Sequence, residues 1–338
     1  MMSFRTLWAL DSSVDGETGQ NPVANDVAAA WFADPGSVTF FRSSANFIYR
    51  LTIGGKPAYL RMAAGTERTA TSIRQELELL EVLAARSVPV VRSLPAWNGD
   101  QVISVGTTIG PMSGVVFEAL PGETRDLDDL DLAGIEHWGA TVGRLHTAMK
   151  DVPAGLRRPA GWASALAWVT RKAASLPEPV AAEGARLREF LLSQPRTPDR
   201  YGLLHTDLEL DNIVWDGDVG AVLDFDEYGE GWYLLDIAKA LTDVLDAGEG
   251  IDSPRVQAFV TGYRQEHPLS DKDVALIPEF LAITKLRMYY VLNRAVNMEP
   301  EEAPVEWLRN LIVRLQGWMA GYEAGLAEDQ VGTLGTEQ

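Results

Sequence analysis

The chain has 338 residues, and its 48 acidic against 29 basic side chains give a formal net charge of −19 at pH 7. A surface of that sign repels nucleic acid, and the absence of cysteine excludes disulfides, cysteine nucleophiles and zinc–thiolate sites. The sequence has no run of about 18 apolar residues and no signal-peptide pattern. We therefore expect a cytoplasmic protein without a membrane or nucleic-acid partner, of undetermined oligomeric state.

A small lobe built on an antiparallel sheet is predicted for residues 1–119, which begin with an extension carrying a short helix at 23–32. Apolar and aromatic runs between turn residues predict the strands of this lobe. They are expected at 38–41, 47–53, 58–62, 101–105 and 115–118. Apolar residues at helical spacing predict one amphipathic helix over 71–86.

A second, mainly helical lobe is predicted for residues 120–325, because Pro121-Gly122 interrupts the strand pattern. It opens with the acidic run Asp126 to Asp131, for which a solvated loop and a substrate-facing role are both open. Its helices are expected at 138–149, within 176–201, and at 236–247, 253–266, 271–297 and 304–325, before a polar tail at 326–338. The fold class is α+β, and 338 residues suit two lobes better than one core.

The most informative segment reads His-x-Asp-x-x-x-x-Asn over residues 205–212 and continues to Asp-Phe-Asp at 224–226. Phosphoryl transfer needs a carboxylate to orient the attacking hydroxyl, and oxygen ligands that hold Mg²⁺ on the nucleotide phosphates. Asp207 can serve as that carboxylate, while Asn212 and Asp224 supply an amide and a second carboxylate. The spacing therefore predicts a site for a nucleotide phosphate and a metal ion.

A β-hairpin is predicted between the two halves of this motif, because apolar runs at 213–215 and 221–223 flank an Asp-Gly turn. If the turn centres near Asp218, Asn212 and Asp224 lie opposite each other. Their Cβ atoms would then be roughly 5 Å apart. One Mg²⁺ could bind both, since Mg²⁺ takes only one or two protein ligands at nucleotide sites.

The run from Gly202 to Ala240 resembles the aminoglycoside phosphotransferase and choline kinase-like family, relatives of the protein kinases. That family shows a His-Gly-Asp-x-x-x-x-Asn loop, an Ile-Asp-Phe-Asp or Ile-Asp-Trp strand end and a downstream Asp-x-Ala helix. Here Thr206 replaces the glycine, and the looser resemblance extends from about Val38 to Trp307. It implies a two-lobed kinase-like fold with Asp207 as the catalytic base and Mg²⁺ on Asn212 and Asp224. It further implies His205 as a brace of the loop, Asp236 as its anchor and Asp226 in a subsidiary role.

The resemblance also implies where the nucleotide binds. The turn containing Ser43, Ser44 and Asn46 would cover the phosphates, because small residues let backbone amides approach an anion. Arg61 would bind the phosphates in place of the protein-kinase lysine and would pair with Glu76. Without such a role, that pair would be a solvated surface contact worth under about 1 kcal/mol. Backbone groups from Glu118 to Leu120 would contact the purine at the hinge.

The resulting prediction is a phosphotransferase that moves the γ-phosphoryl group of ATP or GTP, with Mg²⁺, to a hydroxyl of a small molecule. The net charge of −19 favours an amine-bearing acceptor such as an amino sugar or an amino alcohol. Two alternatives stay open, a nucleotide-binding pseudokinase or regulatory module and a protein Ser/Thr kinase. Catalysis is favoured over the pseudokinase because Asp207, Asn212 and Asp224 are all present.

Overall fold

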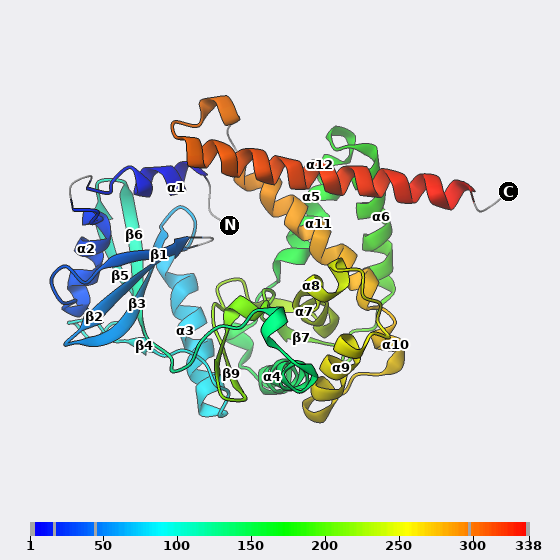
Figure 1. Ribbon diagram of the computed structural model, residues 1–338, viewed down its shortest axis with the longest axis horizontal. Helices are drawn as coiled ribbons and strands as arrows, with labels where there is room; N and C mark the ends of the chain where they lie inside the picture. Colours follow the sequence, from blue (N-terminus) through cyan, green and yellow to red (C-terminus); the bar gives the residue numbers. More distant parts are fainter. Residues whose placement is uncertain (1–3, 16–17, 44–45, 297–298, 336–338) are drawn as a thin grey trace.

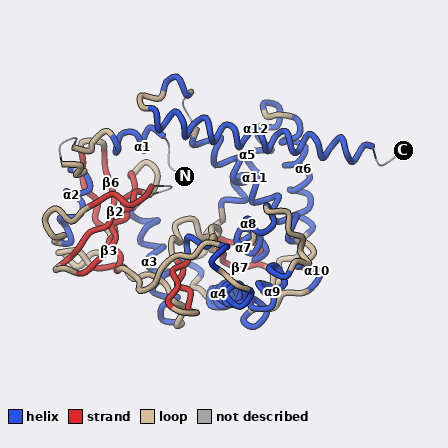
Figure 2. Tube along the Cα trace, in the orientation of Figure 1, coloured by secondary structure: helices blue, strands red, loops and turns tan. Residues whose placement is uncertain are grey.

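The structure is a computed structural model, and it describes residues 4–15, 18–43, 46–296 and 299–335. Ser44, expected at the nucleotide phosphates, lies outside the described residues. A lobe built on a sheet and a larger helical lobe lie side by side (Figure 1). Most of the strands belong to the first lobe and most of the helices to the second (Figure 2). The predicted two-lobed α+β fold is confirmed.

The small lobe is an antiparallel sheet with the strand order β1-β2-β3-β6-β4, and β5 also pairs with β6. Its strands are β1 (Thr39–Ser43), β2 (Phe47–Ile53), β3 (Lys56–Ala64), β4 (Ser93–Leu94), β5 (Ile103–Thr107) and β6 (Gly110–Glu118). Gly54 and Gly55 form the β2–β3 turn with φ of 57° and 77°. A two-residue hairpin turn favours positive φ at both positions, which glycine adopts without steric cost.

Helices cover both faces of this sheet, and the alternation of side chains along β6 shows how. Val115 and Phe117 belong to the same core as helix α3 (Ala70–Ala85), whereas Val116 belongs to the core formed with α2 (Pro22–Ala28). Successive residues of a strand point to opposite faces. The α3 face leads into the main core of the protein, so the sheet and the helical lobe share one continuous apolar interior.

The helical lobe is organised around two helices in unusually close contact, α4 (Leu132–Met149) and α9 (Pro254–Glu266). A Cβ on Gly139 would lie 1.9 Å from the Phe259 carbonyl oxygen, and one on Gly262 would lie 1.8 Å from that of Glu136. The two backbones can meet only because neither position carries a side chain. The other helices are α5 (Gly161–Lys172), α6 (Glu178–Ser193), α7 (Tyr233–Ala240), α8 (Thr242–Asp246), α10 (Asp271–Val274), α11 (Ile277–Ala295) and α12 (Glu306–Gly335).

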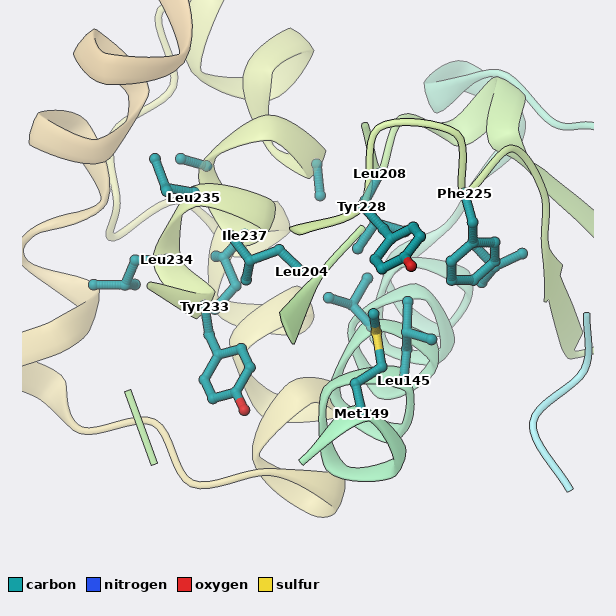
Figure 3. Close-up of a cluster of buried hydrophobic side chains, with 14 of the residues drawn as sticks. Leu145, Met149, Leu204, Leu208, Phe225, Tyr228, Tyr233, Leu234, Leu235 and Ile237 are labelled. Carbon is teal, nitrogen blue, oxygen red and sulfur yellow. The ribbon is translucent and has the colours of Figure 1, made fainter. Parts of the chain in front are cut away.

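A two-stranded sheet and a hairpin hold the segment 205–228 above α4. Strand β7 (Tyr201–Leu204) pairs with β10 (Gly229–Trp232), and β8 (Ile213–Asp216) pairs with β9 (Val219–Val222), both antiparallel. Beneath them, Leu145 and Met149 of α4 pack in one apolar cluster with Leu208 and Phe225 from the two loops (Figure 3). The loops that carry the motif are therefore anchored from below by apolar burial.

The N-terminal helix α1 (Phe4–Asp11) connects the two lobes a second time, away from the hinge (Figure 1). Leu10 lies in the core of the small lobe, while Phe4 is buried against Leu308 and Ile312 of α12. Helix α1 and the start of α12 thus form a strap between the lobes.

Several expected boundaries are wrong. The helix expected at 271–297 is divided into α10 and α11, because Pro278 begins a new helix, and that expected at 236–247 is divided into α7 and α8. Helix α5 was not anticipated. The polar tail expected from residue 326 is helical through Gly335, since Leu326 still packs against the main core. Within the described residues, no helix is both long and apolar enough to cross a membrane.

Candidate active site

The loop that follows β7 is held by a single buried carboxylate, that of Asp236 in the first turn of α7. Its Oδ2 accepts the backbone N–H of His205 at 2.8 Å, and its Oδ1 accepts that of Thr206 at 2.7 Å. Asp236 is fully buried and also accepts the Nε2–H of His146 at 3.0 Å. Asp236 therefore anchors the loop, as the family resemblance implies.

Thr206 occupies a backbone conformation that explains the glycine usual at this place in the motif. Its φ is 77°, a left-handed value that is costly for a β-branched residue. Its hydroxyl donates to the carbonyl oxygen of Glu227 at 3.0 Å, and its backbone N–H is the one bonded to Asp236. These two bonds hold the strained residue in place.

His205 braces the loop from inside the core. Its Nε2–H donates to the carbonyl oxygen of Leu223 at 2.7 Å, and its Nδ1 accepts the backbone N–H of Asp207 at 3.2 Å. One ring nitrogen is therefore a donor and the other an acceptor, which defines the neutral tautomer. The ring is completely buried, so it positions Asp207 without reaching a bound substrate.

The Asp207 side chain lies at the surface of the cleft, with an exposed fraction of 41%. Its Oδ2 accepts from Asn212 Nδ2 at 3.2 Å, and Asn212 Nδ2 also donates to the Asp207 carbonyl oxygen at 2.9 Å. Its Oδ1 lies 3.4 Å from Lys239 Nζ. The carboxylate is thus oriented on both sides and still accessible.

Lys239 is a site residue that we did not predict. It lies on α7, one turn after Asp236, and it is paired with Glu209 as well as with Asp207. Burial alone would lower its pKa, but the carboxylates of Asp207 and Glu209 outweigh burial and raise the pKa of Lys239. A lysine one helical turn after the motif aspartate was the available sequence signal.

The predicted register of the hairpin is wrong by one residue. Ile213 pairs with Val222, and the Leu223 N–H donates to the Asn212 carbonyl oxygen at 2.8 Å, so Asn212 faces Leu223 rather than Asp224. Gly217 and Asp218 both lie in the turn, and its centre therefore falls before Asp218. Asp224 follows with φ of 58°.

The two expected metal ligands have the chemistry of a divalent-cation site. Burial first, and then the neighbouring Asp226, raise the pKa of Asp224 to about 7, although Arg61 opposes this. A divalent cation would offset that concentration of negative charge. The described residues contain no group of three or more His, Cys, Asp or Glu that could hold a metal. Asn212 and Asp224 alone would match the one or two protein ligands that nucleotide-bound Mg²⁺ usually takes.

On the small-lobe side, the predicted pair of Arg61 and Glu76 is a buried, bidentate ion pair with both N···O distances at 2.7 Å. Arg61 Nη1 also lies 3.5 Å from Asp224 Oδ1, so it joins β3 to the metal-site candidate. A second cation, Arg68, was not predicted and bonds to Glu76 at 2.9 Å. Pairing with both arginines lowers the pKa of Glu76 despite its burial. The solvated-pair alternative is therefore excluded.

Ser43 and Asn46, both expected in the turn that covers the phosphates, lie in different places. Asn46 is buried and its Nδ2 donates to Asp226 Oδ2 at 2.8 Å, which links the small lobe to the Asp-Phe-Asp segment. Ser43 lines a separate cavity beside α1. Arg42, which was not predicted, reaches Asp211 and the Oδ1 of Asn212, each at 3.5 Å.

A cavity of about 390 Å³ lies between the lobes and contains much of the predicted nucleotide site. Arg61, Glu76, Glu118, Leu120 and Asp224 all line it, together with the rings of Phe41, Tyr59 and Phe117. Its size lies within the range typical of ligand pockets. The backbone N–H of Glu118 already donates to the Arg92 carbonyl oxygen at 3.0 Å, so this N–H is not free to bind a purine.

A second cavity, of about 400 Å³, opens on the other side of the catalytic loop and is called the acceptor-side cavity below. Thr206, Glu209 and Lys239 line it, along with side chains from α5, α8, α11 and α12. Among the described residues, the acidic side chains that line it are Glu209 and Asp246, and none of the run Asp126 to Asp131 does so. In the acidic run, Asp131 caps α4 and Asp129 accepts the Asp126 N–H, which makes that run a local structural feature.

The fold and this loop define a kinase-like phosphotransferase of the two-lobed type. Residues 37–269 match the family model described as the phosphotransferase enzyme family, and the chain belongs to that family. It is accordingly a phosphotransferase that acts on a hydroxyl group of a small molecule. Use of ATP follows from its kinase relatives.

The chain is similar to several named kinases. Amicoumacin kinase of Bacillus subtilis is 26% identical over 294 residues, covering 82% of this chain and 86% of the relative. Homoserine kinase of Methylobacillus flagellatus is 29% identical over 232 residues, covering 66% of this chain and 69% of the relative.

Solved structures share the fold. Amicoumacin kinase hAmiN, in complex with AMP-PNP, Ca²⁺ and Ami, superposes with a TM-score of 0.72 at 23% identity, covering 91% of this chain and 94% of that one. A microcompartment-associated aminopropanol kinase does so with a TM-score of 0.66 at 22% identity, covering 91% and 97%.

Proposed function

We propose that this phosphotransferase moves the γ-phosphoryl group of ATP, with Mg²⁺, to a hydroxyl of an amine-bearing small molecule. The observation that carries the proposal is the accessible Asp207 carboxylate, which is oriented by Asn212 and by Lys239, a residue that lines the acceptor-side cavity. Homoserine and aminopropanol, the compounds in two of the relatives' names, each carry a hydroxyl and an amine. We prefer ATP to GTP because AMP-PNP, an ATP analogue, is the nucleotide in the related structure.

We assign the nucleotide to residues 1–119 and the acceptor to the lobe from residue 120 onward. Arg61, oriented by Glu76, would bind the phosphates, and Asn46 would cover them from the small lobe, whereas Ser43 lines the separate cavity beside α1. Leu120 would contact the base at the hinge, and Glu118 would line the same cavity beside it. Because ATP is supplied in the cytoplasm, we place the protein there.

In the proposed reaction, Asp207 accepts the proton of the acceptor hydroxyl as its oxygen attacks the γ-phosphorus. The bond between that phosphorus and the oxygen bridging to the β-phosphate breaks, so ADP leaves with the electron pair. Lys239 holds the Asp207 carboxylate in line, and His205 fixes the backbone that carries it. Asn212 and Asp224 would hold Mg²⁺, which when bound neutralises negative charge on the phosphate oxygens.

The test is phosphate transfer from labelled ATP to pooled amino alcohols, amino sugars and peptides. Wild type should label at least one amino alcohol or amino sugar. Asp207→Asn should lower turnover by about 10²- to 10⁴-fold while ATP affinity stays within a few-fold. ATP binding without any transfer would favour the pseudokinase, and labelling of peptides alone would favour a protein kinase.

A further inference from the structure

Half of the described residues that line the acceptor-side cavity lie in segments that the family match does not span. The match ends at residue 269, whereas Ile283 to Met288 of α11 and Trp318 to Tyr322 of α12 form much of the wall. The chemistry of this wall therefore has to be derived from this chain's own residues, and it narrows the class of acceptor.

An aromatic surface is the first feature of this wall. Trp318 keeps 39% of its area exposed although it lines the cavity. Its ring stacks on that of Tyr322, with the planes 5° apart and the centroids 5.7 Å apart. Trp162 of α5 also lines the cavity. A flat, partly exposed indole gains most free energy when another flat apolar group covers it.

The charges of the wall are already balanced. Lys285 Nζ lies 2.6 Å from Asp246 Oδ1, and Lys239 is paired with Glu209. These two pairs include both acidic side chains that line the cavity. Arg287 is paired with Glu227, at the edge of the neighbouring cavity. A polycation such as an aminoglycoside would have to break these pairs, because every carboxylate among the described lining residues is already paired with a cation.

The volume of the cavity also narrows the class of acceptor. A volume of about 400 Å³ has room for roughly a dozen water molecules. An acceptor as small as aminopropanol would leave most of that space to water and would not reach from the catalytic loop to α12. The wall instead suits a larger molecule with one polar end and one flat end.

We propose that the acceptor is an amino alcohol of low net charge whose flat, aromatic body lies on Trp318, and that a polycationic amino sugar is a poor ligand. This inference rests on the proposed function. The net charge led us to expect that the acceptor is captured electrostatically as a cation. The wall formed by α11 and α12 instead favours recognition of an apolar group.

The test measures binding separately from turnover. Calorimetry with Asp207→Asn protein, saturated with AMP-PNP and Mg²⁺, compares alaninol, phenylalaninol and naphthylalaninol, which share one amino alcohol and differ in their apolar group. Kanamycin serves as the polycation. The dissociation constant should fall by at least about tenfold from the methyl to the naphthyl compound, and kanamycin should bind more weakly than the naphthyl compound.

The same series in a Trp318→Ala background should lose most of this preference, and Trp318→Phe should keep much of it. Trp97→Ala, which removes an exposed indole from the small lobe, is the matched control and should leave the series unchanged. A flat or reversed series, undetectable binding of naphthylalaninol, stronger binding of kanamycin, or an unaltered preference in Trp318→Ala would each overturn the proposal. Failure of wild type to phosphorylate any of these compounds would count against the proposed function and would leave the order of binding intact.

Discussion

Asp236→Asn changes one oxygen of the site to nitrogen, and its effect can be worked out from three distances. The carboxylate accepts the N–H groups of His205 and Thr206 at 2.8 and 2.7 Å and the Nε2–H of His146 at 3.0 Å. An asparagine has only one acceptor oxygen, so its NH₂ group must face at least one of these donors. The variant loses a bond to a charged acceptor and leaves a buried donor unpaired.

These two losses set the size of the effect. A hydrogen bond to a charged group contributes about 1.5–3 kcal/mol, and an unpaired buried donor costs about 1–3 kcal/mol. We therefore expect the free energy of unfolding to fall by about 2.5–6 kcal/mol. With an unfolding entropy of about 2.1 cal/mol/K per residue over 338 residues, Tm should fall by roughly 4–8 °C. Misplacement of Asp207 by about 1 Å should also lower kcat about 100-fold.

The assay combines thermal unfolding with labelled-phosphate transfer on the same preparations. Asp243→Asn is the matched control, because it removes the same charge from an exposed position in the next helix. We expect that control to keep the wild-type Tm and kcat. An Asp236→Asn protein with a Tm within about 1 °C of wild type and more than half of its kcat would refute the anchoring role.

Three further predictions concern packing, phosphate binding and pH. Gly262→Ala should lower the free energy of unfolding by at least about 2 kcal/mol, because its Cβ would overlap the Glu136 carbonyl. Gly317→Ala, which has open space around it, should raise the free energy of unfolding by about 0.5–1 kcal/mol. Equal effects of the two substitutions in urea unfolding would contradict the close α4–α9 contact. Arg68→Met should raise the KM for ATP several-fold by loosening the Glu76 carboxylate that orients Arg61, whereas Arg74→Met, at an exposed position of α3, should not. Steady-state kinetics would show an unchanged KM in Arg68→Met if Arg68 has no such role. Burial, and then His146, lower the pKa of His267 from 6.5 to about 4, so the unfolded chain binds a proton that the folded one does not. Up to about 3 kcal/mol of stability should therefore be lost as pH falls from about 6.5 to 4. Urea unfolding across this range should show a smaller loss of stability in His267→Gln, and an identical loss would exclude His267 as its source.

The sequence predicted those parts of the site that depend on spacing along the chain. The loop from His205 to Asn212 lies where the motif places it, and Arg61 and Glu76 meet because a strand and the next helix carry them. The hairpin register was wrong because an Asp-Gly pair indicates a turn without showing which two residues form its tip. One residue was enough to move Asn212 opposite Leu223.

The residues that were missed become significant only through contacts between distant segments. Lys239 reaches Glu209 across 30 positions of sequence, and Arg42 reaches Asn212 across 170. The spacing from Asp236 indicates which face of α7 carries Lys239, but no local pattern shows that Lys239 contacts Glu209 or that Arg42 contacts Asn212. The acidic run shows the converse, because its charge density suggested a substrate entrance, whereas Asp131 caps α4 and Asp129 accepts the Asp126 N–H. Composition gives the net charge of the chain, but the tertiary packing determines which charged side chains lie at the acceptor-side cavity.

The strap formed by α1 and the start of α12 gives the cleft two attachments instead of one. The hinge joins the lobes at one end, and the burial of Phe4 against Leu308 and Ile312 joins them at the other. Two bodies tied at two separated points can rock about the line between those points, but they cannot swivel or slide past each other. Lobe closure on ATP would then follow a single path, and each cycle would return Arg61 and Asp207 to the same relative position.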